Sequence, residues 1–153
     1  MVEKLMKQAI REALKAKEKD EVPIGAVIVK DGKIIARAHN LMEKTQIATA
    51  HAEILAINKA CKKLKSWRLD ECEMFVTIEP CAMCAGAIAN ARLKKVYFGA
   101  YESKSGCAES KYPVLSDSGL NHKVEYLGGI ERDICANIIK NYFKSKRIEK
   151  SLD

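Results

Sequence analysis

The sequence has no long hydrophobic run, and this absence excludes a helix that spans a membrane. No apolar stretch reaches the roughly 18 residues that crossing a bilayer requires. The N-terminal stretch 1–21 carries charges throughout, so it does not resemble a secretory signal peptide. We therefore expect a cytoplasmic protein with no membrane partner.

Internal repeats, flexible linkers and low-complexity segments are also missing. A chain of 153 residues without them is typical of one domain, and we expect 1–153 to fold as a single unit. Hydrophobic residues make up 48% of the chain and charged residues 31%. This composition can bury a core and is not that of a disordered protein.

Cysteines are too sparse for a small disulfide-rich fold, because the chain has six in 153 residues. The chain also has no secretory signal. We expect them to be reduced thiols. Four of them stand in apolar or helical surroundings and are interpreted as small buried hydrophobic residues. These four are Cys61, Cys72, Cys107 and Cys135.

Acidic residues are in the minority. With 27 basic and 20 acidic side chains, the formal net charge is +7, which favours a polyanionic partner. Many basic surfaces are only solvated, however, so charge alone leaves nucleic-acid binding undecided.

Hydrophobic periodicity predicts helices that alternate with strands. Two β-branched runs flank Asp31-Gly32, a pair typical of a type I′ turn, so we expect a hairpin over 24–40. The stretch 101–122 has turn residues and little periodicity, and loops of this length often bind a ligand. The other predicted elements are helices over 2–19, 49–64, 81–91 and about 131–147, and strands over 72–78, 94–100 and about 123–128.

This order of elements predicts an α/β fold. Strands that alternate with helices imply helices on both faces of a mixed sheet, which is a three-layer α/β/α sandwich. The alternation in the centre of the chain implies that the strands there are parallel.

The stretch 77–88, TIEPCAMCAGAI, places two cysteines three positions apart, directly after a proline. Three interpretations compete: a redox dithiol, half of a metal site, or two buried thiols. A thioredoxin-type motif commonly carries proline between its cysteines, whereas Pro80 precedes both, which disfavours the redox dithiol. Pro80 can begin a helix, whose positive end would stabilise Cys81 and Cys84 as thiolates on one face. Thiolates of this kind favour zinc.

The candidate third ligand is His51, which Glu53 follows two residues later at the start of a predicted helix. Positions i and i+2 do not share a helix face, so both could reach one metal only near a helix end. Zinc with three protein ligands leaves a position for water, as in catalytic sites, and Glu53 could accept the proton of that water. His39 and His122 stand outside this pattern but are not excluded as ligands.

His-x-Glu followed by Pro-Cys-x-x-Cys is the signature of zinc-dependent deaminases. Cytidine, guanine and riboflavin-pathway deaminases share it. The flanking stretches favour another branch: the chain closely resembles the bacterial tRNA-specific adenosine deaminases of the TadA type, from its first helix to about Arg147. The matching stretches include EVPIGAVIV, ARAHN, AHAEILAI, WRL, VTIEPCAMCAGAI, VYFGA and LNHKVE.

This resemblance implies a cytidine deaminase-like sandwich with a five-stranded mixed sheet, assembled as a homodimer. It implies hydrolysis of the wobble adenosine in the anticodon loop of tRNA to inosine. It also implies that His51, Cys81 and Cys84 bind one zinc ion per chain and that Glu53 shuttles protons. The residues that the resemblance assigns to substrate binding are Asn40, Ile24 and Asn121.

Two stretches depart from the family pattern. TQIAT at 45–49 replaces an Asp-Pro that often precedes Ala-His-Ala-Glu, and Tyr101-Glu102 replaces an aromatic or basic residue followed by aspartate. These departures concern local RNA contacts and not the chemistry. A guanine deaminase, which needs no basic surface, is the nearest rival, and a catalytically silent RNA-binding subunit is disfavoured because Glu53 is present.

The predicted C-terminal helix combines an apolar stripe with many basic residues. We expect Lys144, Lys146 and Arg147 to contact RNA phosphates, because a polyanionic substrate is implied independently. The alternative is a solvated charged face on a packing helix.

Overall fold

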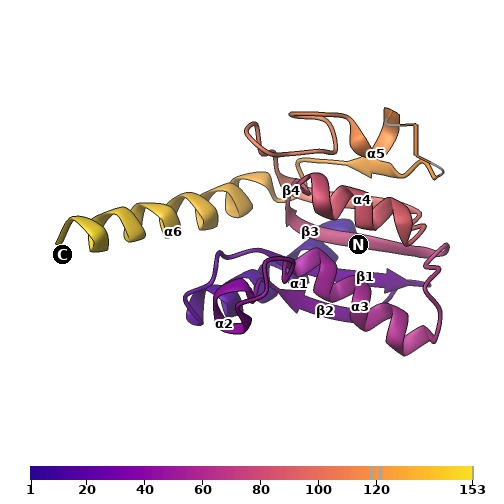
Figure 1. The fold of residues 1–153 in the computed structure, drawn as a ribbon, viewed down its shortest axis with the longest axis horizontal. Coiled ribbons are helices and arrows are strands. Elements are labelled where there is room, and N and C mark those ends of the chain that lie inside the picture. The colour runs from indigo at the N-terminus through magenta and orange to yellow at the C-terminus, as the bar shows by residue number, and fades with distance from the viewer. Residues whose placement is uncertain (118, 121, 153) are drawn as a thin grey trace.

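The computed structural model describes residues 1–117, 119–120 and 122–152 as one mixed sheet with helices on both faces (Figure 1). The strands are β1 (Gly25–Lys30), β2 (Lys33–His39), β3 (Cys72–Ile78), β4 (Lys95–Ala100) and β5 (Glu125–Leu127). The helices are α1 (Val2–Glu18), α2 (Met42–Thr45), α3 (Ala52–Leu64), α4 (Ala82–Asn90), α5 (Val114–Asp117) and α6 (Arg132–Leu152).

The sheet has five strands in the order β2-β1-β3-β4-β5. Strand β1 pairs antiparallel with β2 and with β3, while β3, β4 and β5 run parallel. The β1–β2 hairpin turns at Asp31 and Gly32, whose φ angles of 51° and 76° are both positive, as a type I′ turn requires. The expected hairpin and the parallel centre are both confirmed.

Two hydrophobic cores hold the layers together, one on each face of the sheet. Successive strand residues point to opposite faces, so Ile28 and Met74 pack under α3 and α4, while Val27 and Phe75 pack under α1. Helix α6 joins the α1 side through Cys135, which is buried. The β3-α4-β4 crossover thus places α4 beside α3 on the same face, which is the arrangement that forms the site.

The cysteines outside the Cys-x-x-Cys pair are free thiols. Cys72, Cys107 and Cys135 are buried, as expected for small hydrophobic residues, whereas Cys61 on α3 is only half-buried.

Several element boundaries differ from those that the sequence predicts. The short helix α2 was not expected, and the stretch 101–122 contains the short helix α5. Helices α3 and α4 begin later than predicted, at Ala52 and Ala82, because the residues before them have extended backbone angles. Helix α6 is longer than predicted and continues to Leu152.

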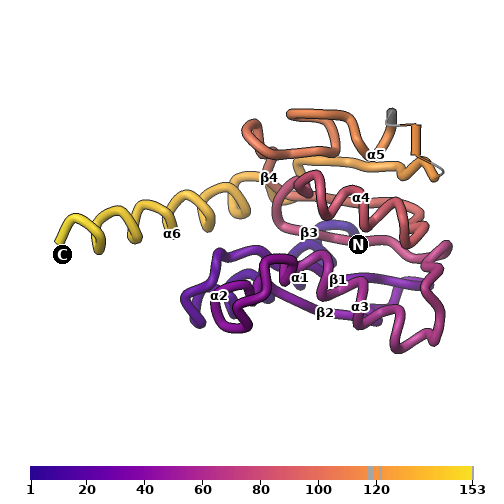
Figure 2. Tube along the Cα trace, viewed as in Figure 1, coloured from indigo at the N-terminus to yellow at the C-terminus, as the bar shows by residue number. Residues whose placement is uncertain are grey.

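Helix α6 begins against the sheet and then extends beyond it, so that the C-terminal end lies away from the sheet (Figures 1 and 2). Two contacts hold its middle part to the loop after α1. The Tyr142 hydroxyl donates a hydrogen bond to the Asp20 carbonyl oxygen at 3.3 Å, and Lys146 forms an ion pair with the Asp20 carboxylate. Within the described part of the chain, no helix combines the length and the apolar character needed to cross a membrane.

Candidate active site

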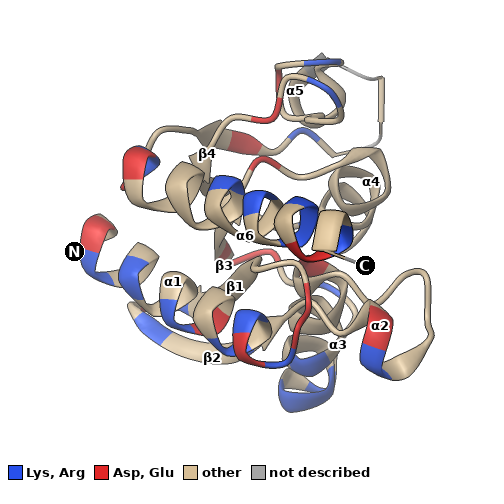
Figure 3. Cartoon of the chain, turned by 90° about the vertical axis from the view of Figure 1, so that its left-hand side faces the viewer, with Lys and Arg blue, Asp and Glu red and all other residues tan. Residues whose placement is uncertain are grey.

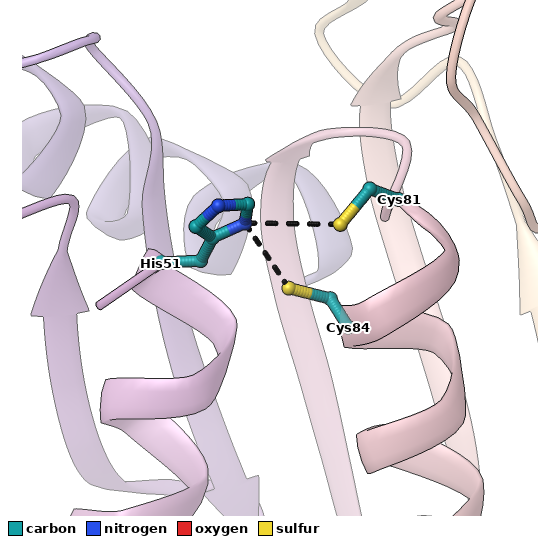
Figure 4. Close-up of side chains that lie close together, drawn as sticks. All are labelled: His51, Cys81 and Cys84. Atoms are coloured by element: carbon teal, nitrogen blue, oxygen red, sulfur yellow. Dashed lines mark hydrogen bonds between the residues drawn. The ribbon is translucent and has the colours of Figure 1, made fainter. Parts of the chain in front are cut away.

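The beginnings of α3 and α4 bring together a histidine and two cysteines. His51 is the N-cap of α3, and Cys81 is the N-cap of α4. The His51 Nδ1 atom lies 3.7 Å from Cys81 Sγ and 3.4 Å from Cys84 Sγ, as Figure 4 shows. One ligand atom from each residue lies within 4.8 Å of the other two.

The cap positions correct one detail of the sequence analysis. Pro80 does not occupy the first helical position, because Cys81 still has extended backbone angles (φ −74°, ψ 177°) and the helix begins at Ala82. Cys81 and Cys84 are therefore the N-cap and third residue of α4, not i and i+3 within it. Both thiols remain close to the positive end of the helix, where a thiolate is stabilised.

The three side chains fit a zinc ion. Two thiols and an imidazole form a donor set that zinc prefers. Hydrogen bonds from the Cys84 thiol and from His51 lower the pKa of Cys81 to about 4, so this ligand is ionised at neutral pH. The same shared proton raises the pKa of Cys84. Zinc would bind both cysteines as thiolates, so its binding would displace this shared proton.

Glu53 lies in the first turn of α3, beside these donors, and is only 3% exposed. Its Oε1 atom has no hydrogen-bond partner among the described residues. Burial raises the pKa of the Glu53 carboxyl to about 7. A buried carboxyl oxygen that lacks a partner is costly to the fold, and a pKa near neutrality suits a group that both accepts and releases protons.

A cavity of about 170 Å³ opens in front of His51, Glu53 and Cys81. Ile24 lines it, and its predicted contact with the substrate base stays a prediction. The other lining residues come from the loop before β1, the C-terminal end of β3, the loop after β4 and α6. They are Val22, Ile78, Glu79, Glu102, Ser105, Ile139 and Phe143.

Asn40 is buried and lies beside the site without lining this cavity. Its Oδ1 atom accepts a hydrogen bond of 2.9 Å from the backbone N–H of Ala52, the residue between His51 and Glu53. Asn40 therefore holds the first turn of α3 in place, a role that the sequence analysis did not anticipate. Asn121 lies outside the described residues, so its predicted contact with the substrate stays a prediction.

The other two histidines do not join the cluster. The His39 ring lies between Glu12 Oε1 and Lys19 Nζ, each 3.0 Å from one of its nitrogens. The His122 ring donates from Nε2 to the carbonyl oxygen of Leu93 at 2.8 Å. Both rings are engaged in other contacts, which leaves His51 as the histidine of the site.

Sequence reasoning missed the residues that reach the cavity from distant parts of the chain. Ile139 and Phe143 lie on α6, more than eighty positions after Glu53. Glu102 and Ser105 lie in the loop after β4, for which the sequence indicated a binding role; it named Glu102 only as a departure from the family pattern and did not name Ser105. Glu79 directly precedes the Pro-Cys-x-x-Cys motif, and its position there was the one signal that could have drawn attention to it.

The chain matches the family of MafB19-like deaminases over residues 2–147. It is 48% identical to the tRNA-specific adenosine deaminase of Bacillus subtilis over 145 residues, which cover 95% of this chain and 90% of that relative. It is also 48% identical to the tRNA-specific adenosine deaminase of Aquifex aeolicus over 124 residues, which cover 81% of this chain and 82% of that relative.

Solved structures show the same relationship. A structure from a study of A-to-I editing by tRNA:A34 deaminases at the wobble position of transfer RNA matches with a TM-score of 0.85 at 42% identity, covering 88% of this chain and 98% of the other. A guanine deaminase from Bacillus subtilis matches with a TM-score of 0.64 at 42% identity, over 72% of this chain and 69% of the other. The predicted α/β/α sandwich and the predicted deaminase class are confirmed. The chain belongs to the MafB19-like deaminase family and, within it, to the tRNA-specific adenosine deaminases.

Proposed function

We propose that this enzyme hydrolyses the wobble adenosine in the anticodon loop of tRNA to inosine, with one zinc ion held by His51, Cys81 and Cys84. The observation that carries the proposal is the buried Glu53, whose Oε1 atom has no hydrogen-bond partner among the described residues, beside that donor set at the wall of a cavity. The relatives named tRNA-specific adenosine deaminases support the choice of substrate.

Zinc at these ligands would supply Lewis-acid chemistry, including a lowered pKa of water. Glu53 performs the proton transfers. Its carboxylate accepts a proton from the attacking water and delivers it to the adenine ring nitrogen. It then accepts the second proton, from the hydroxyl group now on the carbon, and delivers it to the departing amino group, so that adenosine and water yield inosine and ammonia. The apolar residues Ile24, Ile139 and Phe143 around the cavity exclude bulk water and offer surfaces for the base.

The decisive experiment is mass spectrometry of nucleosides after incubation with total tRNA, run beside free adenosine, cytidine and guanine. Inosine from tRNA alone supports the proposal. The guanine deaminase at 42% identity makes conversion of free guanine the specific alternative. The greater coverage and TM-score of the tRNA deaminase structure, and the net charge of +7, favour RNA. Conversion of guanine without inosine in tRNA would reverse this choice.

The exposed side of α6 is the proposed surface for RNA phosphates, because lysine and arginine recur along it (Figure 3). The structure changes the predicted set of contacts. Lys146 pairs with Asp20 and Glu149, so its charge is already compensated within the fold. Exposed Lys140, Lys144 and Arg147 lie at i, i+4 and i+7 and share another face of the helix.

Changing Lys140, Lys144 and Arg147 to alanine should weaken tRNA binding and flatten its salt dependence. Each lost phosphate contact should reduce the slope of log affinity against log salt by about 0.7 to 0.9. The rate at saturating tRNA should fall much less than the affinity, since α6 supplies none of the proton transfers. Binding curves at several salt concentrations measure this slope.

Lys146→Ala and Lys144→Ala form a matched pair for this surface. Each variant removes one lysine from the same helix, but only Lys144 is free of an ion pair with Asp20. We expect the slope to change for Lys144→Ala and to stay near that of the parent for Lys146→Ala. Equal slopes for the parent and the triple variant would move the RNA surface away from α6.

We also propose that Asn40 contacts the target nucleoside through Nδ2, since Oδ1 is bonded to Ala52. Asn40→Asp keeps an oxygen for the Ala52 N–H and loses the amide donor. It should keep the hydrogen bond to the Ala52 N–H while kcat/KM for tRNA falls by about tenfold or more. Asn40→Ala should also lose about 1 kcal/mol of stability, because the start of α3 is no longer capped. If Asn40→Asp has the kinetics of the parent, Asn40 only stabilises the start of α3 and does not contact the nucleoside.

The family resemblance further supports a homodimer, which sedimentation of the zinc-loaded protein would test. The proposed substrate places the activity in the cytoplasm, where tRNA is modified and used.

A further inference from the structure

Glu79 accepts hydrogen bonds from one whole loop. Its carboxylate is 2% exposed, and it receives backbone N–H groups from Glu102 at 3.0 Å, Ala108 at 3.1 Å and Glu109 at 2.8 Å. The backbone N–H and the hydroxyl of Ser110 also donate to it. The loop between β4 and α5 therefore folds around this one buried anion.

The loop is also packed tightly against Glu79. A Cβ atom added to Gly106 would lie 2.4 Å from the Glu79 Cδ and Oε1 atoms, so only glycine leaves room for the carboxylate. The backbone N–H of Cys107 donates to the Pro80 carbonyl oxygen at 2.7 Å. The chain at 102–110 has neither helix nor strand, so these contacts take the place of regular structure in holding it.

The same loop forms a wall of the active-site cavity through Glu102 and Ser105. Glu79 stands two positions before Cys81, at the point where β3 leads into the zinc-binding turn. One side chain thus connects the motif that holds the metal to the loop that faces the substrate. Without the carboxylate, four backbone N–H groups would lose their acceptor.

We propose that Glu79 is a positioning residue, which holds the loop 102–110 in the conformation that recognises the nucleotides around the target adenosine. The inference rests on the proposed function, because it assigns to this loop a part in binding RNA. Glu79 also lines the cavity, but both of its carboxylate oxygens accept hydrogen bonds from the loop, so it acts through the loop and not as a group that transfers protons.

Glu79→Gln tests this role without a change of size. In either orientation of the amide, its nitrogen would replace an oxygen that accepts backbone N–H groups. The loop would therefore lose some of its hydrogen bonds. With an anticodon stem-loop as the substrate, we expect KM to rise at least about tenfold while kcat stays within about threefold, with zinc at about one per chain. A fall in kcat together with loss of zinc, at unchanged KM, would overturn the proposal, because Glu79 would then support the metal motif.

The direction of the change in RNA affinity distinguishes a lost positioning of the loop from a lost negative charge. Removing a negative charge should strengthen binding to a polyanion if the charge alone matters. The matched control is Glu71→Gln, which makes the same substitution at an exposed residue just before β3, at the opposite end of the strand from Glu79. We expect Glu71→Gln to bind RNA as well as the parent or slightly better, and Glu79→Gln to bind it less well. Equal effects of the two variants would overturn the proposal.

Gly106→Ala perturbs the same contact from the loop side and leaves the carboxylate in place. It should reproduce the higher KM of Glu79→Gln, and it keeps the proposal testable if the glutamine variant folds poorly. A KM like that of the parent for Gly106→Ala would contradict the proposal.

Hydrogen exchange of the RNA-free, zinc-loaded protein gives a readout that does not depend on activity. In Glu79→Gln, exchange in 102–110 should accelerate by about tenfold or more, while α4 stays protected as in the parent. Unchanged exchange in 102–110 would overturn the positioning role. If the parent makes no inosine, the proposed function fails, and the exchange result still shows whether Glu79 holds the loop.

Discussion

Replacing Glu53 by glutamine should abolish inosine formation while the protein still folds and binds zinc. The amide has the same size but cannot carry protons, and general acid–base catalysis commonly contributes about 10²–10⁴-fold to the rate. Because Glu53 is proposed to serve several transfers in one reaction, we expect kcat to fall by at least the upper part of that range. Single-turnover assays with tRNA, beside elemental analysis for zinc, measure both quantities.

The Glu53 carboxyl is buried without a partner for Oε1, so its removal should not cost stability. A neutral amide is easier to bury than an ionised carboxylate, and we expect a melting temperature at or above that of the parent. Glu71→Gln is again the control, and we expect it to have the activity of the parent. A Glu53→Gln enzyme within tenfold of the parent rate would mean that another group transfers the protons.

Cys81→Ser and Cys84→Ser should each lower the zinc content from about one per chain to near zero, and activity should be lost with the metal. Serine is a poor neutral ligand at neutral pH, whereas the Cys81 thiol ionises readily because its pKa is lowered to about 4. The measurement is elemental analysis of freshly purified protein, paired with the inosine assay. The loss should be almost complete for each variant, because only His51 and the remaining cysteine would be left as ligands.

Cys61→Ser is the matched control for these substitutions. Cys61 is a free, half-buried thiol on α3, outside the cluster that brings His51 together with the cysteine pair. We expect this variant to keep its zinc and its rate. A zinc content near zero in fully active parent protein would refute the metal site itself.

Two relatives of similar identity carry different substrate names, a tRNA deaminase structure and a guanine deaminase structure. The proposed zinc site with its neighbouring glutamate accounts for hydrolytic deamination but not for the choice of base or polymer. In this chain, the cavity walls come from the loop after β4 and from α6. Substrate choice is therefore expected to depend on these walls, which is why the loop anchor Glu79 and the cations of α6 are informative targets.

The sequence by itself determined which side chains gather in the cluster of His51, Cys81 and Cys84. His51-x-Glu53 and Pro80-Cys81-x-x-Cys84 lie within short stretches, so local spacing alone places each pair on one helix start. It also determined the hairpin at Asp31-Gly32, since positive φ angles restrict which residues can stand there. The alternation of elements was enough for the sandwich, because helices and strands have different hydrophobic periods.

Only the tertiary structure decided which distant residues surround that chemistry. Phe143 reaches the cavity because α6 packs on the α1 side of the sheet, against β4 and β3. The charge of Lys146 is compensated because the loop after α1 brings the Asp20 carboxylate next to it. Glu79 is a single polar residue in the sequence, and its importance lies in backbone N–H groups more than twenty positions away. Such contacts depend on how layers pack, and a short sequence pattern carries no information about which backbone groups a fold leaves without an acceptor.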